Sequence, residues 1–281
     1  CSNQNPMEAI IWNVDPEIFA LGPFSVRYYG LLFALAFVFG YIIMKRYFAM
    51  DKLPIERLDM LTTYVFIGTL VGARLGHCFF YEPDFYLQNP VEILKVWHGG
   101  LASHGAAIGI ILALYFYSRK TKIPLLKILD RVVIVVALGG FFIRMGNFFN
   151  SEIYGYNTSM PWGVIFAQKG ETVPKHPTQI YEALIALIIF FSLHKFFIKY
   201  YKRFPDGLVF GMFLVSLFTM RFLIEYIKEP QVPFETEMSL NMGQWLSLPF
   251  IIFGLGLIIF LFYKKSYLIR TENSDQNRNK L

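Results

Sequence analysis

Residues 244–263 read QWLSLPFIIFGLGLIIFLFY, a stretch without a single charged side chain. A helix needs about 20 mainly apolar residues to cross the hydrocarbon core of a bilayer, so this stretch is long enough. The chain as a whole is similar: 55% of its 281 residues are hydrophobic and 16% are charged, with a mean hydropathy of +0.45. Soluble domains carry about 25% charged residues. The composition therefore predicts an integral membrane protein, and 30 Phe and 17 Tyr exclude a disordered chain.

Other apolar stretches of similar length precede this one. We predict an all-α, polytopic membrane protein with seven transmembrane helices, at residues 26–44, 61–81, 100–118, 129–149, 180–198, 207–227 and 244–263. The expected organisation is an extracytoplasmic segment 1–25, one transmembrane catalytic domain 26–263 and a cytoplasmic tail 264–281, with residues 151–179 as an extracytoplasmic loop or cap.

Lysine and arginine concentrate in every second connection. They cluster after the first, third, fifth and last apolar stretches, and the connections between are poor in cations. By the positive-inside rule the N-terminus lies outside and the C-terminus in the cytoplasm. The same bias accounts for the net charge of +6, so no nucleic-acid partner is expected.

A few ionisable residues fall inside or near the ends of the predicted spans. A charge at the centre of a membrane helix costs about 2.5–3.5 kcal/mol on insertion scales, so each one needs a reason. The expected topology puts all of them toward the outer face, which predicts a polar cavity that opens outward. The residues are Tyr29, Arg74, His104, Arg144, Glu182, Arg221 and Glu225.

Each of these residues also has a purely structural explanation. Arg221 and Glu225 are four residues apart and could simply neutralise each other. Arg74 could extend to the outer interface. Glu182 could favour a helix N-terminus, and His104 could be an ordinary hydrogen-bonded residue of the bundle.

The chemistry that these residue types suggest is the handling of an anion at the outer leaflet. Arginine offers two parallel donors that match a phosphodiester. Histidine titrates near neutrality and can accept a proton from a thiol or a hydroxyl. No phosphate-binding loop, nucleophile elbow or zinc-ligand motif occurs in the sequence, so we expect no metal and no organic cofactor.

Five ordered blocks resemble the prolipoprotein diacylglyceryl transferase family, over roughly residues 7–263. The central block is RMGNFFNSEIYG at 144–155, with Ile143 where the family usually has Gly. Leu217, one turn before Arg221, stands where some relatives have Tyr. The other blocks are GPF at 22–24 with Tyr29-Gly30, HGGLASHG at 98–105, HPTQIYE at 176–182, and RFLIE at 221–225 with Glu229-Pro230 and MGQ at 242–244.

The resemblance implies an enzyme of the bacterial plasma (inner) membrane with its active site toward the periplasmic leaflet. It would move the diacylglyceryl group of phosphatidylglycerol to the lipobox cysteine in the signal peptide of a prelipoprotein, giving a thioether and glycerol phosphate. By position, His104 would accept the thiol proton, Arg144 would hold the lipid phosphate and Arg221 would stabilise the leaving phosphate. Glu225 would orient that arginine, and the remaining site would be lined by Tyr29, Asn147, Glu152 and Gly155.

Two other classes stay open from the residues alone. A seven-helix transporter would place its ionisable groups at the bilayer midplane. A lipid-binding membrane protein without catalytic activity would need the arginines but not His104.

Overall fold

The structure is a computed structural model that describes residues 9–21, 24–95, 100, 102–229 and 238–278. These residues include seven helices of 17 residues or more, one over each predicted span. Five of them are long and apolar enough to cross a membrane: α1, α2, α6, α7 with the turn that follows it, and α8 as far as Lys264. The seven helices are α1 Tyr28–Met50, α2 Ile55–Phe80, α4 Ser103–Thr121, α5 Leu125–Phe149, α6 Thr178–Lys199, α7 Leu208–Ile224 and α8 Met242–Arg278.

The expectation of an all-α chain is wrong in detail, because short strands flank the helices. β1 (Ile10–Trp12) pairs in parallel with β4 (Val164–Phe166), and β2 (Glu17–Leu21) forms an antiparallel hairpin with β3 (Phe24–Arg27). These runs are rich in β-branched and aromatic residues but are far too short to span a bilayer. The β1–β4 pair joins the N-terminal segment to the predicted cap.

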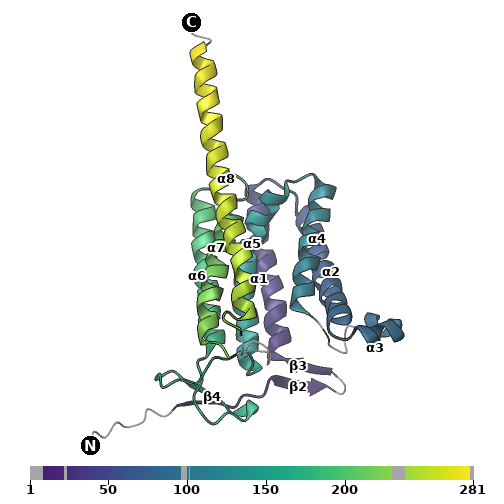
Figure 1. Cartoon of the computed structure of the whole chain (residues 1–281). Coiled ribbons are helices and arrows are strands. Elements are labelled where there is room, and N and C mark those ends of the chain that lie inside the picture. The colour runs from purple at the N-terminus through teal and green to yellow at the C-terminus, as the bar shows by residue number, and fades with distance from the viewer. Residues whose placement is uncertain (1–8, 22–23, 96–99, 101, 230–237, 279–281) are drawn as a thin grey trace, which may run out of the picture. The chain divides into compact units, whose positions relative to one another are not determined.

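Residues 1–40 and 132–281 form one compact unit, which we call the first unit. In it α7 packs along α8 and α6 packs on α7. Gly211 and Gly254 allow the close approach of α7 and α8, since a methyl group at Gly254 would lie 3.0 Å from the Gly211 carbonyl oxygen. Figure 1 shows the strands at one end of these helices, while α8 runs on past the other end. The helix continues through residues 264–278, which the sequence assigned to a tail.

Residues 41–131 form the second unit, built on the antiparallel pair α2 and α4. The two helices meet along a seam of glycines: Gly68 and Gly72 on α2 face Gly109 and Gly105 on α4. Small residues spaced by four let helix backbones approach closely, as is common in membrane helix pairs. A short helix α3 (Pro83–Gln88) and the 3-10 helix η1 (Pro90–Leu94) follow α2.

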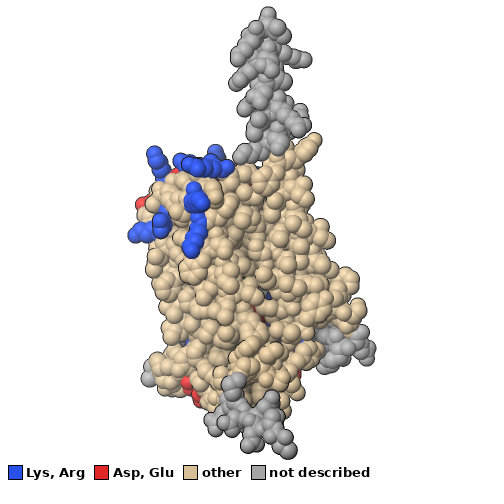
Figure 2. All heavy atoms as spheres, turned by 90° about the vertical axis from the view of Figure 1, so that its left-hand side faces the viewer, with Lys and Arg blue, Asp and Glu red and all other residues tan. Residues whose placement is uncertain are grey.

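Basic side chains gather at one end of the first unit. Lys195 and Lys199 at the end of α6, and Lys202 and Arg203 before α7, are exposed. Figure 2 shows blue side chains concentrated near the top of this face of the molecule. The opposite end of the same helices holds the strands and the polar cluster described next.

Candidate active site

The last turns of α5 carry the first part of a polar cluster. Arg144 donates from Nη1 to Asn147 Oδ1 at 3.3 Å, and Asn147 donates from Nδ2 to Glu152 Oε1 at 2.7 Å. Asn150 donates to the same carboxylate oxygen at 3.2 Å. Because residues 144 and 147 are one turn apart, they share a face of α5. The Glu152 carboxylate is thus turned back toward the helix that precedes it.

A strained turn holds Glu152 in this position. Its neighbours Ser151 and Ile153 have φ angles of 52° and 62°, a left-handed conformation that is an outlier for a β-branched residue. The first turn of α6 fixes the turn from the other side. Thr178 donates to the Ile153 carbonyl at 2.8 Å and Gln179 donates to the Glu152 carbonyl at 2.7 Å. Both donors are fully buried. Their hydrogen bonds hold a strained backbone conformation that costs about 1–3 kcal/mol per residue.

An ionic chain links α5, α6 and the end of α7. Arg144 Nε lies 3.0 Å from Glu182 Oε2, as an ion pair without a hydrogen bond to that oxygen. The other oxygen of Glu182 accepts from Lys228 Nζ at 3.0 Å, and Lys228 also donates to Glu225 Oε2 at 3.3 Å. Glu182, Glu225 and Lys228 are all buried. Buried charges are tolerated only when paired, and here each has an opposite charge within reach.

Two glycines make room for side chains of the cluster. A methyl group at Gly146 would lie 2.7 Å from the ring of Tyr29, so that ring rests directly on the α5 backbone. A methyl group at Gly243 would lie 2.4 Å from the Glu225 carboxyl carbon. The first turn of α8 is itself held by Asn241 and Gln244, which cap each other reciprocally. The site therefore draws on the start of α1 and of α8 as well.

Gly155 lies against backbone rather than beside a charged group. A methyl group there would stand 2.3 Å from the Ile227 carbonyl oxygen, and Gly155 forms a bridge with Lys228. Its contribution is to let the cap approach the segment that carries Lys228.

Arg221 differs from the other cations of the first unit's cluster. Its side chain is half-buried, and it makes no ion pair or hydrogen bond with any residue in the described ranges. Arg144 by contrast is already engaged by Glu182 and Asn147. The guanidinium of Arg221 keeps its full set of donors, which is the state required to bind a phosphate through two parallel bonds.

His104 belongs to the second unit, so the structure does not group it with these residues. It is the second residue of α4, its side chain is exposed, and it has no partner among described residues. His98, Gly99 and Leu101 of the same motif lie outside the described residues, as does Pro230 of the EP motif.

Arg74, also in the second unit, has a structural task. It is buried and donates to the backbone carbonyls of Glu92, Ile93 and Gly100 at 2.6, 2.9 and 3.3 Å, with Tyr86 5.0 Å away. It therefore holds the segment after α2 in place instead of extending to the interface.

The cap carries a second ionic group, centred on Lys175. Its Nζ bonds to Glu229 and lies 3.4 Å from Glu171, and Tyr154 donates to Glu171 at 2.7 Å. Burial lowers the pKa of Lys175, but the two carboxylates raise it by more, so the pKa lies above its ordinary 10.5. Burial, with Glu171 and Glu229 adding to it, raises the pKa of Tyr154 above 10.0. The group ties the cap to the segment after α7.

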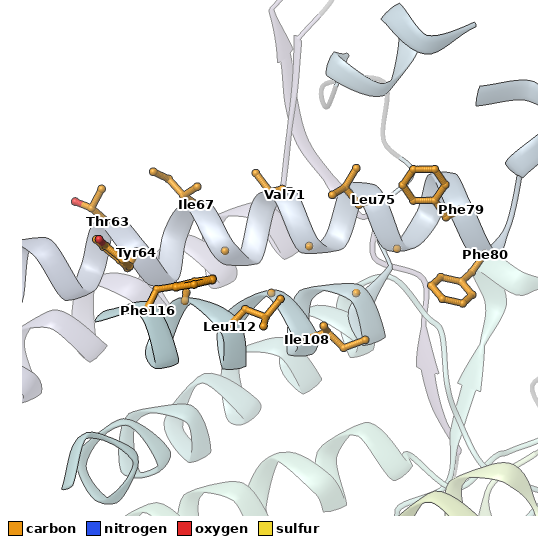
Figure 3. Close-up of a pocket in the computed structure, with 16 residues that line it drawn as sticks. Thr63, Tyr64, Ile67, Val71, Leu75, Phe79, Phe80, Ile108, Leu112 and Phe116 are labelled. Atoms are coloured by element: carbon orange, nitrogen blue, oxygen red, sulfur yellow. The ribbon is translucent and has the colours of Figure 1, made fainter. Parts of the chain in front are cut away.

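The second unit also has an apolar groove of about 570 Å³ along the glycine seam. Figure 3 shows Ile67, Val71 and Leu75 along α2, and Ile108 and Leu112 along α4. All five side chains are exposed. The missing glycine side chains leave the floor of the groove open, and its chemistry suits acyl chains or another apolar helix.

Sequence reasoning missed three of these features. Lys228 carries no local signal of its role, because its partner Glu182 is 46 residues away in the chain. The supporting roles of Thr178 and Gln179 depend on a strained turn for which glycine would be expected. Lys175 likewise has a distant partner, Glu229, 54 residues away in the chain. A lysine close to an EP or HPxQ motif was the only available signal.

The fold and site define a class: a multi-pass, mostly helical membrane protein with two arginines and buried, paired carboxylates at one end of its helices. Comparison with known proteins agrees. The family profile of prolipoprotein diacylglyceryl transferase matches residues 16–260. The chain belongs to this family.

Named relatives cover almost the full chain. A phosphatidylglycerol–prolipoprotein diacylglyceryl transferase of Tolumonas auensis is 47% identical over 89% of this chain and 96% of its own length. Proteins with the same name from Chloroherpeton thalassium and Bacteroides fragilis are 45% and 40% identical, each over 93% of this chain and at least 97% of their own lengths.

Proposed function

We propose that the protein transfers the diacylglyceryl group of phosphatidylglycerol to the lipobox cysteine of prelipoproteins, the first step of lipoprotein maturation. Family membership supports the reaction, and one observation in the structure supports the site: Arg221 has no ion-pair partner among the described residues, whereas Arg144, Glu182, Glu225 and Lys228 are linked by ion pairs. An unpaired, half-buried guanidinium needs an anion, and the phosphodiester of the lipid is one.

In the proposed reaction the cysteine thiolate attacks the carbon of the diacylglyceryl group that is bonded to the phosphate oxygen. A C–S bond forms, the C–O bond to phosphate breaks, and glycerol phosphate leaves with the electron pair. Charge builds on the phosphate as the bond breaks, so Arg221 stabilises the transition state more than the bound lipid. Arg144 would hold the lipid phosphate through the N–H donors that Glu182 and Asn147 do not occupy.

The thiol must lose its proton before it attacks, because the thiolate is the nucleophile and an ordinary cysteine has a pKa near 8.5. The resemblance assigns the acceptor role to His104. A competing route lets the arginines lower the thiol pKa directly. A pH–rate profile of His104→Gln separates the two, since loss of the low-pH limb supports a histidine base and an unchanged profile supports the arginines.

For topology we propose that all seven long helices span the bacterial plasma membrane, with the N-terminus outside and the site near the outer leaflet. The basic residues between α6 and α7 follow the C-terminal end of α6, whereas Glu182 of the cluster lies near its N-terminal end, as the positive-inside rule requires. Cysteines placed at Lys122 and Lys169 should then react with impermeant reagents from opposite sides. Labelling from one side would contradict this topology.

The position of the cluster argues against a transporter. Arg144 lies five residues before the end of α5, Glu182 lies in the second turn of α6, and Glu225 directly follows α7. A transporter would be expected to place such groups at the midplane.

The direct test is reconstitution in vesicles that contain phosphatidylglycerol, together with a peptide that carries a lipobox cysteine. The expected product is the peptide with one added diacylglyceryl group, detected by mass spectrometry. A peptide with serine in place of the cysteine is the matched control. If folded protein in phosphatidylglycerol vesicles never modifies the cysteine peptide, the proposed function is wrong.

A further inference from the structure

Lys228 occupies the centre of the ionic chain. Its side chain is 5% exposed, and it is the only cation that contacts two carboxylates of the cluster within the described parts of the chain. Lysine is strongly hydrated and is almost never buried without a partner, so this position is specified by Glu182 and Glu225. We propose that Lys228 is a positioning residue for the transfer reaction, an inference that rests on the proposed function.

The first step of the argument concerns Glu182, whose two oxygens serve different cations. Oε1 accepts from Lys228 at 3.0 Å, while Oε2 lies 3.0 Å from Arg144 Nε without a hydrogen bond. A carboxylate released by Lys228 would be able to rotate and form the two-pronged bond that arginine prefers. Arg144 would then use its N–H donors to bind Glu182 instead of the lipid phosphate. Lys228 prevents this by competing for one oxygen.

The second step concerns Glu225, which Lys228 holds at 3.3 Å. The carboxyl carbon of Glu225 rests where a side chain at Gly243 would be, so it cannot move toward α8. Without the ammonium, Glu225 and Glu182 would be two buried carboxylates with one fewer cation between them. Their uncompensated negative charge would attract Arg144 and Arg221 and draw them away from the phosphate.

The third step concerns the backbone of Lys228, which the cap fixes in place. Gly155 forms a bridge with Lys228, and Tyr156 N donates to the Ile227 carbonyl at 3.0 Å. The ammonium therefore projects from a supported segment. Such support is what holds a side chain within the fraction of an ångström that catalytic geometry requires.

The experiment compares full-length variants in phosphatidylglycerol vesicles with the lipobox peptide. Lys228→Met removes the charge at similar length, and Lys228→Arg restores a cation. Lys175→Met is the matched control, because Lys175 is also buried between two carboxylates but contacts no residue of the ionic chain. Thermal unfolding in detergent gives the folded fraction, and kcat and the KM for lipid are measured per folded enzyme.

A misplaced arginine should lower kcat by about 10- to 100-fold in Lys228→Met, with a smaller change in KM, since the lost contact acts on the charge that develops at the transition state. Lys228→Arg should recover most of kcat. Lys175→Met should lose thermal stability but keep far more of kcat than Lys228→Met, because the Gly155–Lys228 bridge and the charges of the ionic chain stay in place.

The inference is overturned if Lys228→Met keeps the wild-type kcat per folded enzyme, or if Lys175→Met loses as much. Should Lys228→Met not fold, Lys228→Gln takes its place with the same criterion, because an amide keeps the hydrogen bonds without the charge. The wild-type measurement distinguishes a failure of the proposed role of Lys228 from a failure of the proposed function. Product from the wild type with full turnover by the neutral variant refutes only the role of Lys228, whereas no product from the wild type refutes the function itself.

Discussion

A methyl group on the α2–α4 seam would test how closely these helices are packed. In Gly109→Ala the new Cβ would lie 2.0 Å from the Gly68 carbonyl oxygen, well inside the optimum separation of about 3.5 Å. The obstacle is backbone, so the helices must separate or shift. Overpacking of this kind costs about 1–3 kcal/mol, and the higher helix propensity of alanine returns at most about 1 kcal/mol. The 2.0 Å approach to backbone puts the cost at the upper end of this range, so we expect a net loss of about 2 kcal/mol.

The assay is reversible unfolding in mixed detergent micelles, followed by circular dichroism. Gly256→Ala is the matched control, since α8 leaves open space around that position and the change should be neutral or slightly stabilising. If Gly109→Ala unfolds at the same or a higher denaturant fraction than the wild type, the backbone contact at the seam does not exist as described.

Three further changes address the site and the cap. Arg221→Lys keeps the charge but loses the paired donors, so kcat/KM for the lipid should fall about 10- to 100-fold, and near-normal turnover would contradict phosphate binding there. Gly243→Ala should displace Glu225 and lower kcat without unfolding the chain, which kinetics and circular dichroism check together. The raised pKa values of Lys175 and Tyr154 mean that the cap is stabilised from near-neutral pH up to about pH 10 and loses that stability as the pH rises further. The melting temperature should therefore drop above this pH, and less steeply in Lys175→Met; equal slopes would rule out the contribution of this group.

The positions of the long helices follow from the sequence because apolar length is a local property. The stretch 244–263 predicts α8 without reference to any other residue. The grouping of Arg144, Glu182 and Glu225 could also be anticipated, since the alternation of the loops gives each helix a direction. The end of each helix at which a residue lies is thus predictable from one chain.

The tertiary contacts between elements could not be predicted from the sequence in this way. Pairing of β1 with β4 joins residues more than 150 positions apart, and neither strand is long enough to be predicted from its own sequence. The turn at Ser151 and Ile153 adopts a conformation that their side chains disfavour, and only the buried donors Thr178 and Gln179 impose it. Propensity fails where tertiary contacts override it.

The contact between Gly243 and Glu225 bears on how the protein is made. The ribosome delivers the start of α8 last among the elements that surround the site, long after α1 and α5 have left the exit tunnel. Until then Glu225 lacks the surface on which it rests, and the anion site is unfinished. The proposed enzyme would meet its lipid everywhere in the bilayer during insertion, yet it would stay inert until its final helix arrives.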